Sequence, residues 1–241
     1  MLRPDNIGLR LFCIIQPMTD KNIYPGVRLG ACAEYLRGVP LFDVGTDHCL
    51  LPIYAVSRLG VPFAVASDVV DGPVETARKA VGTAGLEDVI EVVKADGLDG
   101  TVLPVPCDVV IAGMGGELIK NILSRKPELK EEGVRLILQP MTKKAELRDY
   151  LTGNGFEIIS ETVCFDGKYY SIICASYTGV NTALSSAEKE VGRASVQTDR
   201  AKYAEYRFLK AEELEKAVRG KKLGGIDTSA DEKLIEELRR T

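Results

Sequence analysis

Two short segments, residues 41–48 and 109–116, carry the side chains that could do chemistry in this chain. The first contains two acids and the only histidine of the sequence, Asp43, Asp47 and His48. The second ends in three closely spaced glycines, which would let a flat ligand approach the backbone. Each segment starts as a short apolar run, as a buried parallel strand does. Because ligands bind at the carboxyl edge of open α/β sheets, the two segments predict one active site at that edge.

Further apolar runs alternate with amphipathic stretches, and this alternation predicts a mostly parallel sheet with helices between the strands. The expected strands are residues 40–45, 63–68, 89–95, 108–113 and 134–140. The expected helices are residues 50–58, 73–83, 117–124 and 143–152. Two later runs, 156–164 and 169–177, flank an Asp-Gly pair that is typical of a hairpin turn. A parallel α/β sheet that ends in an antiparallel hairpin is the outline of the Rossmann-like class I methyltransferase fold.

The composition changes after residue 177 and predicts a C-terminal antiparallel helical hairpin. Ser185 and Glu188 form a capping-box pattern, which predicts the start of one long helix that runs to about residue 219. Ser229 and Glu232 predict the start of a second, shorter helix. We therefore expect three parts, which are an N-terminal extension (1–24), a class I methyltransferase domain (25–179) and the helical hairpin (180–241).

The N-terminal extension contains an apolar stretch, residues 11–15, that is far too short to span a bilayer. No small-residue cleavage site follows it, so a secretory signal is not expected. Met18 is followed by four polar residues, so residues 1–17 could equally lie upstream of the native start.

The composition of the 241 residues, 45% hydrophobic and 27% charged, is that of a soluble globular protein and excludes disordered and collagen-like classes. The six cysteines are scattered without metal-ligand spacing, and a single histidine could add little to a metal site. We expect reduced thiols, no metal and a cytoplasmic location.

The acidity of the chain is concentrated in its centre. Residues 41–179 contain 13 basic and 20 acidic side chains, a net charge of −7, whereas residues 1–40 carry +2 and residues 180–241 carry +1. The two ends could still offer a basic patch, although neither resembles a strongly basic nucleic-acid domain.

Four motifs follow one another in order: Asp43-Val44-Gly45-Thr46-Asp47-His48, Ser67-Asp68, Asp96-Gly97 and Ile111-Ala112-Gly113-Met114-Gly115-Gly116. This set resembles the bacterial tRNA (adenine-22-N1)-methyltransferase family, the TrmK-like enzymes of the class I fold. The similarity covers nearly all of residues 28–175. It implies methylation of N1 of adenosine 22 in the D-loop of tRNA, with S-adenosyl-L-methionine as cofactor and tRNA as partner. We expect no metal, no membrane and no obligate protein partner.

The resemblance and the strand ends together predict the cofactor site. Gly45 is expected beside the methionine part of the cofactor, where a side chain would collide, although it could also be a plain turn. Asp68 is expected to accept hydrogen bonds from the ribose hydroxyls. Its alternative role as a helix cap is weakened because Asp71 already offers that cap. Asp96 is expected to accept from the adenine amino group, although Asp-Gly is also an ordinary turn. The remaining expected cofactor contacts are Asp43, Gly97 and Gly113.

A nicotinamide cofactor fits the first turn poorly, because residues 45–50 lack the GxGxxG pattern. A carboxylate in this turn would also be unfavourable beside the pyrophosphate of such a cofactor, because both groups are negatively charged. S-adenosyl-L-methionine carries a positive sulfonium instead, which suits a pocket lined by acids.

Asp47 is the predicted catalytic residue. N1 of adenine has an in-plane lone pair at neutral pH, so the enzyme must mainly align that nitrogen with the methyl carbon. A carboxylate that accepts a hydrogen bond from N6 would orient the ring and stabilise the positive charge that develops there. The alternative is that Asp47 caps the helix that begins near Leu50. His48 could contact the substrate or be a buried histidine bonded to backbone.

Met114, Gly115 and Gly116 are predicted to form a wall of the adenine pocket. They stand where enzymes that methylate exocyclic amines often carry an Asn/Asp-Pro-Pro-aromatic motif, and its absence permits a ring-nitrogen target. A base drawn out of the tRNA could stack on one of three tyrosines, Tyr54, Tyr169 or Tyr170. Basic side chains that could hold the tRNA body are Arg28, Arg37, Arg193, Arg200, Lys202, Arg207 and Lys210.

Several alternatives stay open at this point. Charged helix faces are often only solvated, so the basic side chains need not contact RNA. The substrate could be another RNA site or a small molecule. The chain could also be a non-catalytic RNA-binding protein on a methyltransferase fold, although the intact acids and glycines argue against such decay.

Overall fold

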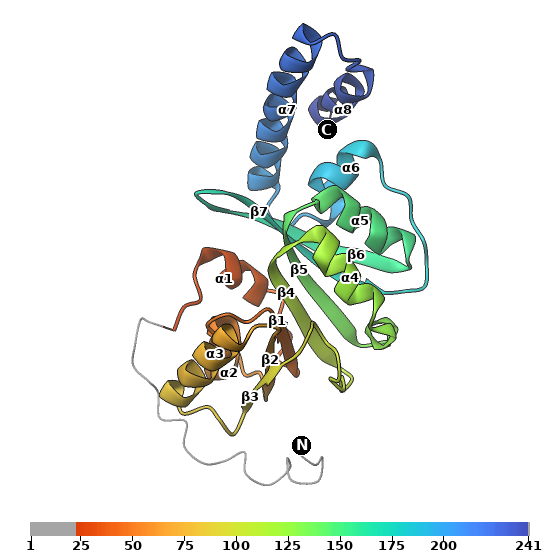
Figure 1. The fold of residues 1–241 in the computed structure, drawn as a ribbon. Coiled ribbons are helices and arrows are strands. Elements are labelled where there is room, and N and C mark those ends of the chain that lie inside the picture. Colours follow the sequence, from red (N-terminus) through yellow and green to blue (C-terminus); the bar gives the residue numbers. More distant parts are fainter. Residues whose placement is uncertain (1–22, 241) are drawn as a thin grey trace.

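Seven strands form one mixed sheet in the computed structural model, which describes residues 23–240 (Figure 1). The strand order is β3-β2-β1-β4-β5-β7-β6. Neighbours among β1 to β5 are parallel, and β7 runs antiparallel to both β5 and β6. The strands are β1 Leu41–Val44, β2 Ala64–Asp68, β3 Ile90–Lys94, β4 Cys107–Gly115, β5 Val134–Thr142, β6 Phe156–Asp166 and β7 Lys168–Tyr177. The expected fold class, a mostly parallel Rossmann-like sheet that ends in an antiparallel hairpin, is confirmed.

Helices cover both faces of the sheet, and a helical hairpin projects from one end of it (Figure 1). The helices are α1 Val27–Ala33, α2 Leu50–Arg58, α3 Asp71–Ala84, α4 Gly116–Ser124, α5 Lys144–Gly153, α6 Ser186–Val191, α7 Arg200–Leu223 and α8 Ser229–Arg240. Short 3-10 helices, Pro127–Lys130 and Ala194–Val196, precede β5 and α7.

Alternation along the central strands divides the core into two layers. In β1, Phe42 packs into the core that contains Ile119 of α4 and Leu147 of α5. Its neighbour Leu41 packs into the core on the other face, with Leu51 of α2 and Ala77 of α3. The parallel strands are therefore buried on both faces, and only their ends and connecting loops are available for chemistry.

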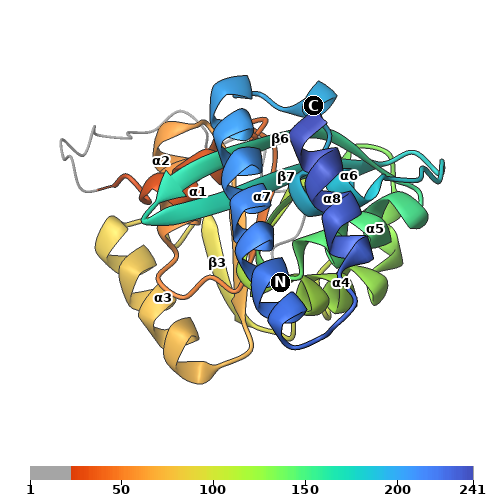
Figure 2. The ribbon, with the colours of Figure 1, turned by 90° about the horizontal axis from the view of Figure 1, so that it is seen from above.

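The C-terminal pair is confirmed, but its expected long first helix is wrong. The capping box at Ser185 is present, yet α6 ends at Val191 and α7 begins only at Arg200. Gly192 separates them with φ 87°, and a Cβ there would collide with Glu161 of β6. Figure 2 shows α7 and α8 side by side, and Leu238 of α8 belongs to the same apolar cluster as residues at the base of α7.

Other elements differ in extent from expectation. Helix α1 was not expected from the sequence, since its N-cap Gly26 offers no side-chain hydrogen bond. Strand β4 extends through Met114 to Gly115, so the glycine segment is part of the sheet and not a loop. Both strands of the terminal hairpin are also longer than expected.

The expectations for residues 1–17, for the apolar stretch 11–15 and for Cys13 lie outside the described residues. Within residues 23–240 no helix is both long and apolar enough to cross a membrane. The five cysteines described are unpaired and buried. The division of the chain at residues 24 and 179 stays a prediction.

Candidate active site

The two chemically distinctive segments meet at the carboxyl edge of the sheet. β1 and β4 are neighbours, and Val44 pairs with Ile111 in the register that joins them. Gly45 follows with φ 80°, and a Cβ on it would collide with Cε of Met114. Residues far apart in sequence therefore meet at one edge, as the parallel sheet predicts.

The turn after β1 exposes Asp47 and His48. Their side chains are 72% and 60% exposed, and His48 Nε2 lies 3.4 Å from Asp47 Oδ2. Helix α2 begins at Leu50 with Cys49 as N-cap and no side-chain cap. The capping alternative for Asp47 is therefore wrong, and so is the buried alternative for His48. Both side chains are open to a ligand.

Backbone strain is concentrated at this edge. Among the described non-glycine residues, φ is positive only at Asp47 (21°), Cys49 (56°) and Lys143 (55°). The first two belong to the turn after β1, and Lys143 follows β5. Left-handed backbone at non-glycine residues costs free energy and often marks a functional site.

Asp43 lies within β1 and is 7% exposed. Burial raises the pKa of its carboxyl group to about 6, against the opposing effects of the Thr46 hydroxyl and the Arg28 guanidinium. Arg28 reaches this edge from α1, where its Nη1 donates to Gln139 Oε1 at 2.7 Å. The same oxygen accepts from the backbone N–H of Gly113 at 3.1 Å. Arg28 was expected to contact tRNA, but the structure places it against Gln139 of β5 and Gly113 of β4.

Asp68 ends β2 and is partly buried. Its Oδ1 accepts from the backbone N–H of Val70 at 2.9 Å. Helix α3 begins at Asp71 with Val70 as N-cap and no side-chain cap, while Asp71 pairs with Lys94 at 2.7 Å. The expectation that Asp71 caps α3 is wrong. Val69 and Val70, which follow Asp68, are 57% and 55% exposed, and we did not expect these apolar side chains at the surface.

Asp96 and Gly97 follow β3 at the same edge. The Asp96 carboxylate accepts from Arg125 Nη1 at 2.8 Å, and this hydrogen bond lowers the pKa of Asp96. The carbonyl of Gly97 accepts from Ser67 Oγ at 3.0 Å, which ties the end of β2 to this turn. Any ligand bound by Asp96 would share it with Arg125, a partner that the sequence did not indicate.

The glycines after Ala112 lie at the end of β4 and make close contacts with the end of β5. The pairing of β4 with β5 shifts register at Met114 and Gly115, which makes the strand end irregular. A Cβ on Gly115 would lie 3.1 Å from Thr142 Oγ1. A Cβ on Gly116 would collide with the backbone carbonyls of Thr142 and Lys143. Gly116 therefore lets α4 start against the end of β5.

The basic side chains expected at the tRNA body fall into different environments. Arg193 is bound to Glu188 at 3.2 Å and to the carbonyl of Ala183 at 2.9 Å. Arg37 pairs with Asp108 at 2.8 Å, at the opposite edge of the sheet, where β4 begins. These two arginines serve as structural links.

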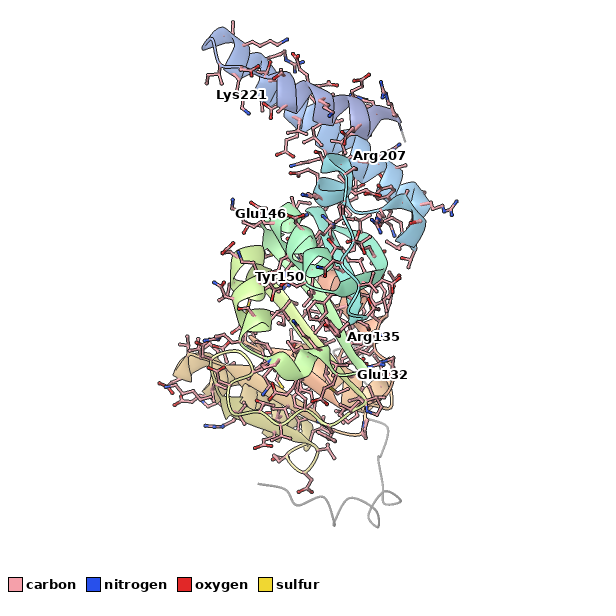
Figure 3. The ribbon with its side chains drawn as sticks, turned by 90° about the vertical axis from the view of Figure 1, so that its right-hand side faces the viewer. Glu132, Arg135, Glu146, Tyr150, Arg207 and Lys221 are labelled. Atoms are coloured by element: carbon pink, nitrogen blue, oxygen red, sulfur yellow. The ribbon has the colours of Figure 1, made fainter. Side chains whose placement is uncertain are left out.

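Four expected basic residues lie on α7. Arg200 and Lys202 are exposed in its first turn, and Lys202 pairs with Asp199 at 3.0 Å. Arg207 lies 6.0 Å from the centre of the Tyr203 ring, and Lys210 is near two glutamates. Figure 3 shows Arg207 nearer to the sheet than Lys221.

The tyrosines considered for base stacking also have neighbours. Tyr54 meets Tyr24 edge to face at 6.0 Å between ring centres. Tyr169 packs between Phe165 and Tyr206, while Lys168 lies 5.4 Å from the centre of the Tyr170 ring. Tyr169 also lines a groove of about 420 Å³ between the end of β5 and α7. The charged and aromatic side chains that line the groove are Lys143, Lys144, Lys168, Lys210, Glu146, Glu190, Glu213, Tyr169 and Tyr206, so the groove carries both signs of charge.

Carboxylates and glycines from four neighbouring strands gather at this edge of the sheet. Gly45 and Gly113 both have φ 80°, and the side chains of Met114 and Arg28 lie against them. Asp43, Asp68 and Asp96 provide carboxylates at the ends of three neighbouring strands. Within residues 23–240 no group of three histidine, cysteine or acidic side chains could hold a metal.

Comparison with known proteins agrees with this geometry. The model of one family, described as TrmK, tRNA (adenine(22)-N(1))-methyltransferase, matches residues 41–237. The tRNA (adenine(22)-N(1))-methyltransferase of Bacillus subtilis is 36% identical over 150 residues, which span 61% of this chain and 63% of that protein. The chain therefore aligns with less than two thirds of this relative's length.

Solved structures extend the similarity over most of the chain. A Streptococcus pneumoniae protein in complex with S-adenosyl-L-methionine is 32% identical, with a TM-score of 0.73 over 88% of this chain and 97% of that one. The TrmK protein of M. capricolum, in complex with S-adenosyl-homocysteine, gives a TM-score of 0.74 at 24% identity and covers 89% of this chain and 96% of that one. At this identity the second likeness supports the fold alone.

Proposed function

The chain belongs to the TrmK family, and from this membership we propose that it methylates N1 of adenosine 22 in tRNA with S-adenosyl-L-methionine as methyl donor. The observation that carries the proposal is the family match over residues 41–237, which includes the whole sheet and both C-terminal helices in large part. The acids and glycines at the carboxyl edge support it, because they suit an adenosine-containing cation.

The cofactor would lie across the ends of β1, β2, β3 and β4. Asp68 would accept from the ribose hydroxyls through the oxygen not used by Val70, and the exposed valines beside it offer an apolar face to the adenine. Asp96 and Gly97 would border the adenine edge. Gly45, Gly113 and Asp43 would surround the methionine part. When bound, S-adenosyl-L-methionine supplies an electrophilic methyl group on a positively charged sulfur.

Asp47 is the proposed catalytic residue. Its exposed carboxylate lies in the turn after β1 and caps no helix. Its oxygens can therefore accept a hydrogen bond from N6 of the target adenine. This contact would orient N1 and stabilise the charge that spreads to N6 during transfer. His48 lies beside Asp47 and would contact the substrate. Met114, Gly115 and Gly116 would form the facing wall.

The helical hairpin would hold the tRNA body through the exposed basic residues at the base of α7. Arg200 and Lys202 are the best placed, because both side chains are exposed there. Arg207 would add a contact further along α7. A tRNA substrate implies action in the cytoplasm, which remains an expectation.

The proposal is tested by methyl transfer to two unmodified tRNA transcripts that differ only at position 22. We expect incorporation into the transcript with adenosine and none into the transcript with guanosine. Equal incorporation into both would reject position 22 as the target. Incorporation into neither, with measurable cofactor binding, would reject tRNA as the substrate.

A further inference from the structure

The junction between the sheet and the projecting hairpin contains a buried ion pair. Arg148 of α5 and Glu161 of β6 meet at 2.8 Å between Nε and Oε1, and their side chains are 0% and 1% exposed. Arg148 Nη1 also donates to the carbonyls of Lys189 and Glu190 at 2.9 and 3.0 Å. These carbonyls lie in the last turn of α6, so Arg148 fixes the end of that helix.

Glu161 holds the segment that leads into α7. Its Oε2 accepts from Gln197 Nε2 at 2.8 Å, and its backbone carbonyl accepts from Thr198 N–H at 2.9 Å. Gly192 fits against the same carboxylate, where any Cβ would collide. Tyr203, in the first turn of α7, donates its hydroxyl to the Gly192 carbonyl at 2.9 Å. Residues 192–198, which lead into α7, are therefore held against the ion pair.

A buried ion pair is a poor source of stability, because desolvation of both charges offsets much of their attraction. This one also leaves Arg148 Nη2 and Gln197 Oε1 buried without a hydrogen-bond partner in the described structure. Such a pair can instead select one geometry, since the hydrogen bonds form only when the elements lie in one arrangement. Here those elements are α5, β6, α6 and the start of α7.

The geometry at this junction matters because α7 is long, so a small tilt at its base displaces its far end by several ångströms. Its 24 residues span about 36 Å at 1.5 Å per residue. A tilt of about 10° at its base would therefore move its far end by about 6 Å. Figure 1 shows the hairpin extending away from the sheet, so the junction at its base sets where the far end lies.

We infer that the Arg148–Glu161 pair is a positioning element that sets the direction of the α7–α8 hairpin, so that hairpin and active site engage one tRNA together. The inference rests on the proposed function. Two linked surfaces bind one ligand more tightly than either alone, because the second contact is intramolecular. A loosened junction lowers the effective concentration of the second surface and weakens tRNA binding without touching the cofactor site.

Glu161→Gln tests this, since it removes the charge and keeps the shape. We expect KM for tRNA to rise about tenfold, while kcat and the Kd for S-adenosyl-L-methionine stay within about twofold. Asp108→Asn is the matched control. Asp108 is also fully buried and also bound to an arginine at 2.8 Å, but at the opposite edge of the sheet. It should leave KM for tRNA unchanged.

The distance between two spin labels provides a second measurement, which a change in overall stability alone would not alter. Labels at Lys79→Cys on α3 and Lys216→Cys on α7 should give a narrow distance distribution in the wild-type background and in Asp108→Asn. The distribution should broaden in Glu161→Gln. If Glu161→Gln does not fold, Gln197→Met carries the test, because it removes the hydrogen bond through which Glu161 holds the segment before α7.

Equal KM values and equal distance distributions in the Glu161 and Asp108 variants would overturn the inference and leave the proposed function intact. A wild-type protein that methylates no tRNA would reject the proposed function. The label distances would still decide whether the pair sets the direction of the hairpin.

Discussion

Asp43 and Asp47 belong to the same strand end but have opposite environments. Asp43 is buried and its pKa is raised to about 6, whereas the Asp47 side chain is 72% exposed. Two carboxyl groups with such different surroundings can serve different roles in one site. We assign Asp43 to the cofactor and Asp47 to the target base, and each assignment has its own test.

Asp47→Asn should retain cofactor affinity and lose turnover. The amide keeps the size of the side chain but removes the negative charge that, in the proposed mechanism, stabilises N6 in the transition state, so we expect kcat to fall about 100-fold. Steady-state kinetics with tRNA, alongside cofactor binding by calorimetry, would measure both effects.

The control for this variant is Asp88→Asn. Asp88 is an exposed aspartate before β3, at the edge of the sheet away from the site. It should change neither quantity. Full activity of the Asp47 variant would remove Asp47 from the mechanism.

The raised pKa of Asp43 predicts a pH-dependent cofactor affinity. Below about pH 6 the carboxyl group is mainly protonated, because burial disfavours its charged form. A bound cation favours the ionised form, so affinity for S-adenosyl-L-methionine should weaken as pH falls below about 6. The limit is about tenfold per pH unit. Above that pH the affinity should level off.

Calorimetric titration between pH 5 and pH 8 would measure this dependence. Asp43→Asn should bind more weakly, with an affinity that stays level across the same range. An identical slope in the wild-type protein and in Asp43→Asn would show that another group titrates.

At the scale of elements, the contact between α4 and the end of β5 shapes the wall that we propose for the target adenine. Gly116→Ala should reduce activity strongly, because the added Cβ would push the start of α4 away from the carbonyls of Thr142 and Lys143. Gly153→Ala is the control, since a Cβ there meets nothing within 4 Å. Initial rates and thermal unfolding of both variants would separate a local displacement from loss of fold. Wild-type rates in the Gly116 variant would contradict the proposed wall.

The strands and most helices of the sheet could be predicted from the sequence, because periodicity and terminal glycines are local signals. The break at Gly192 could not, since its cause is the carboxylate of Glu161 on another element. The Arg125 partner of Asp96 is hidden for the same reason. Asp71 matched a cap pattern, but pairs with Lys94 instead. Local patterns identified the strand ends and missed the long-range partners that modify them.

Over the whole molecule, binding of tRNA should depend on salt through the exposed cations at the base of α7. Replacement of Arg200 and Lys202 together by Ala should weaken binding and reduce the slope of log K against log salt by about 1 to 2. Lys79→Ala on α3 is the control, because its exposed cation lies away from the hairpin. Binding isotherms from low to moderate salt would give the slopes. An unchanged slope would mean that these side chains are only solvated.

The sequence indicated the family and the location of the site, but not the roles of single basic residues. Motif order gave the family and the edge of the sheet, while the acidic centre matches the cluster of carboxylates there. Roles for individual basic residues could not be predicted, because Arg28 and Arg37 bind partners that are distant in the sequence, and Arg193 binds a glutamate of the preceding helix.

The most direct test of the central claim is the identity and position of the methylated base. Unmodified tRNA with adenosine at position 22 is incubated with the protein and S-adenosyl-L-methionine, then digested and examined by mass spectrometry, with Asp47→Asn in parallel. The account predicts 1-methyladenosine at position 22 with the wild-type protein and almost none with the variant. N6-methyladenosine, methylation at another position, or no product despite cofactor binding would contradict it.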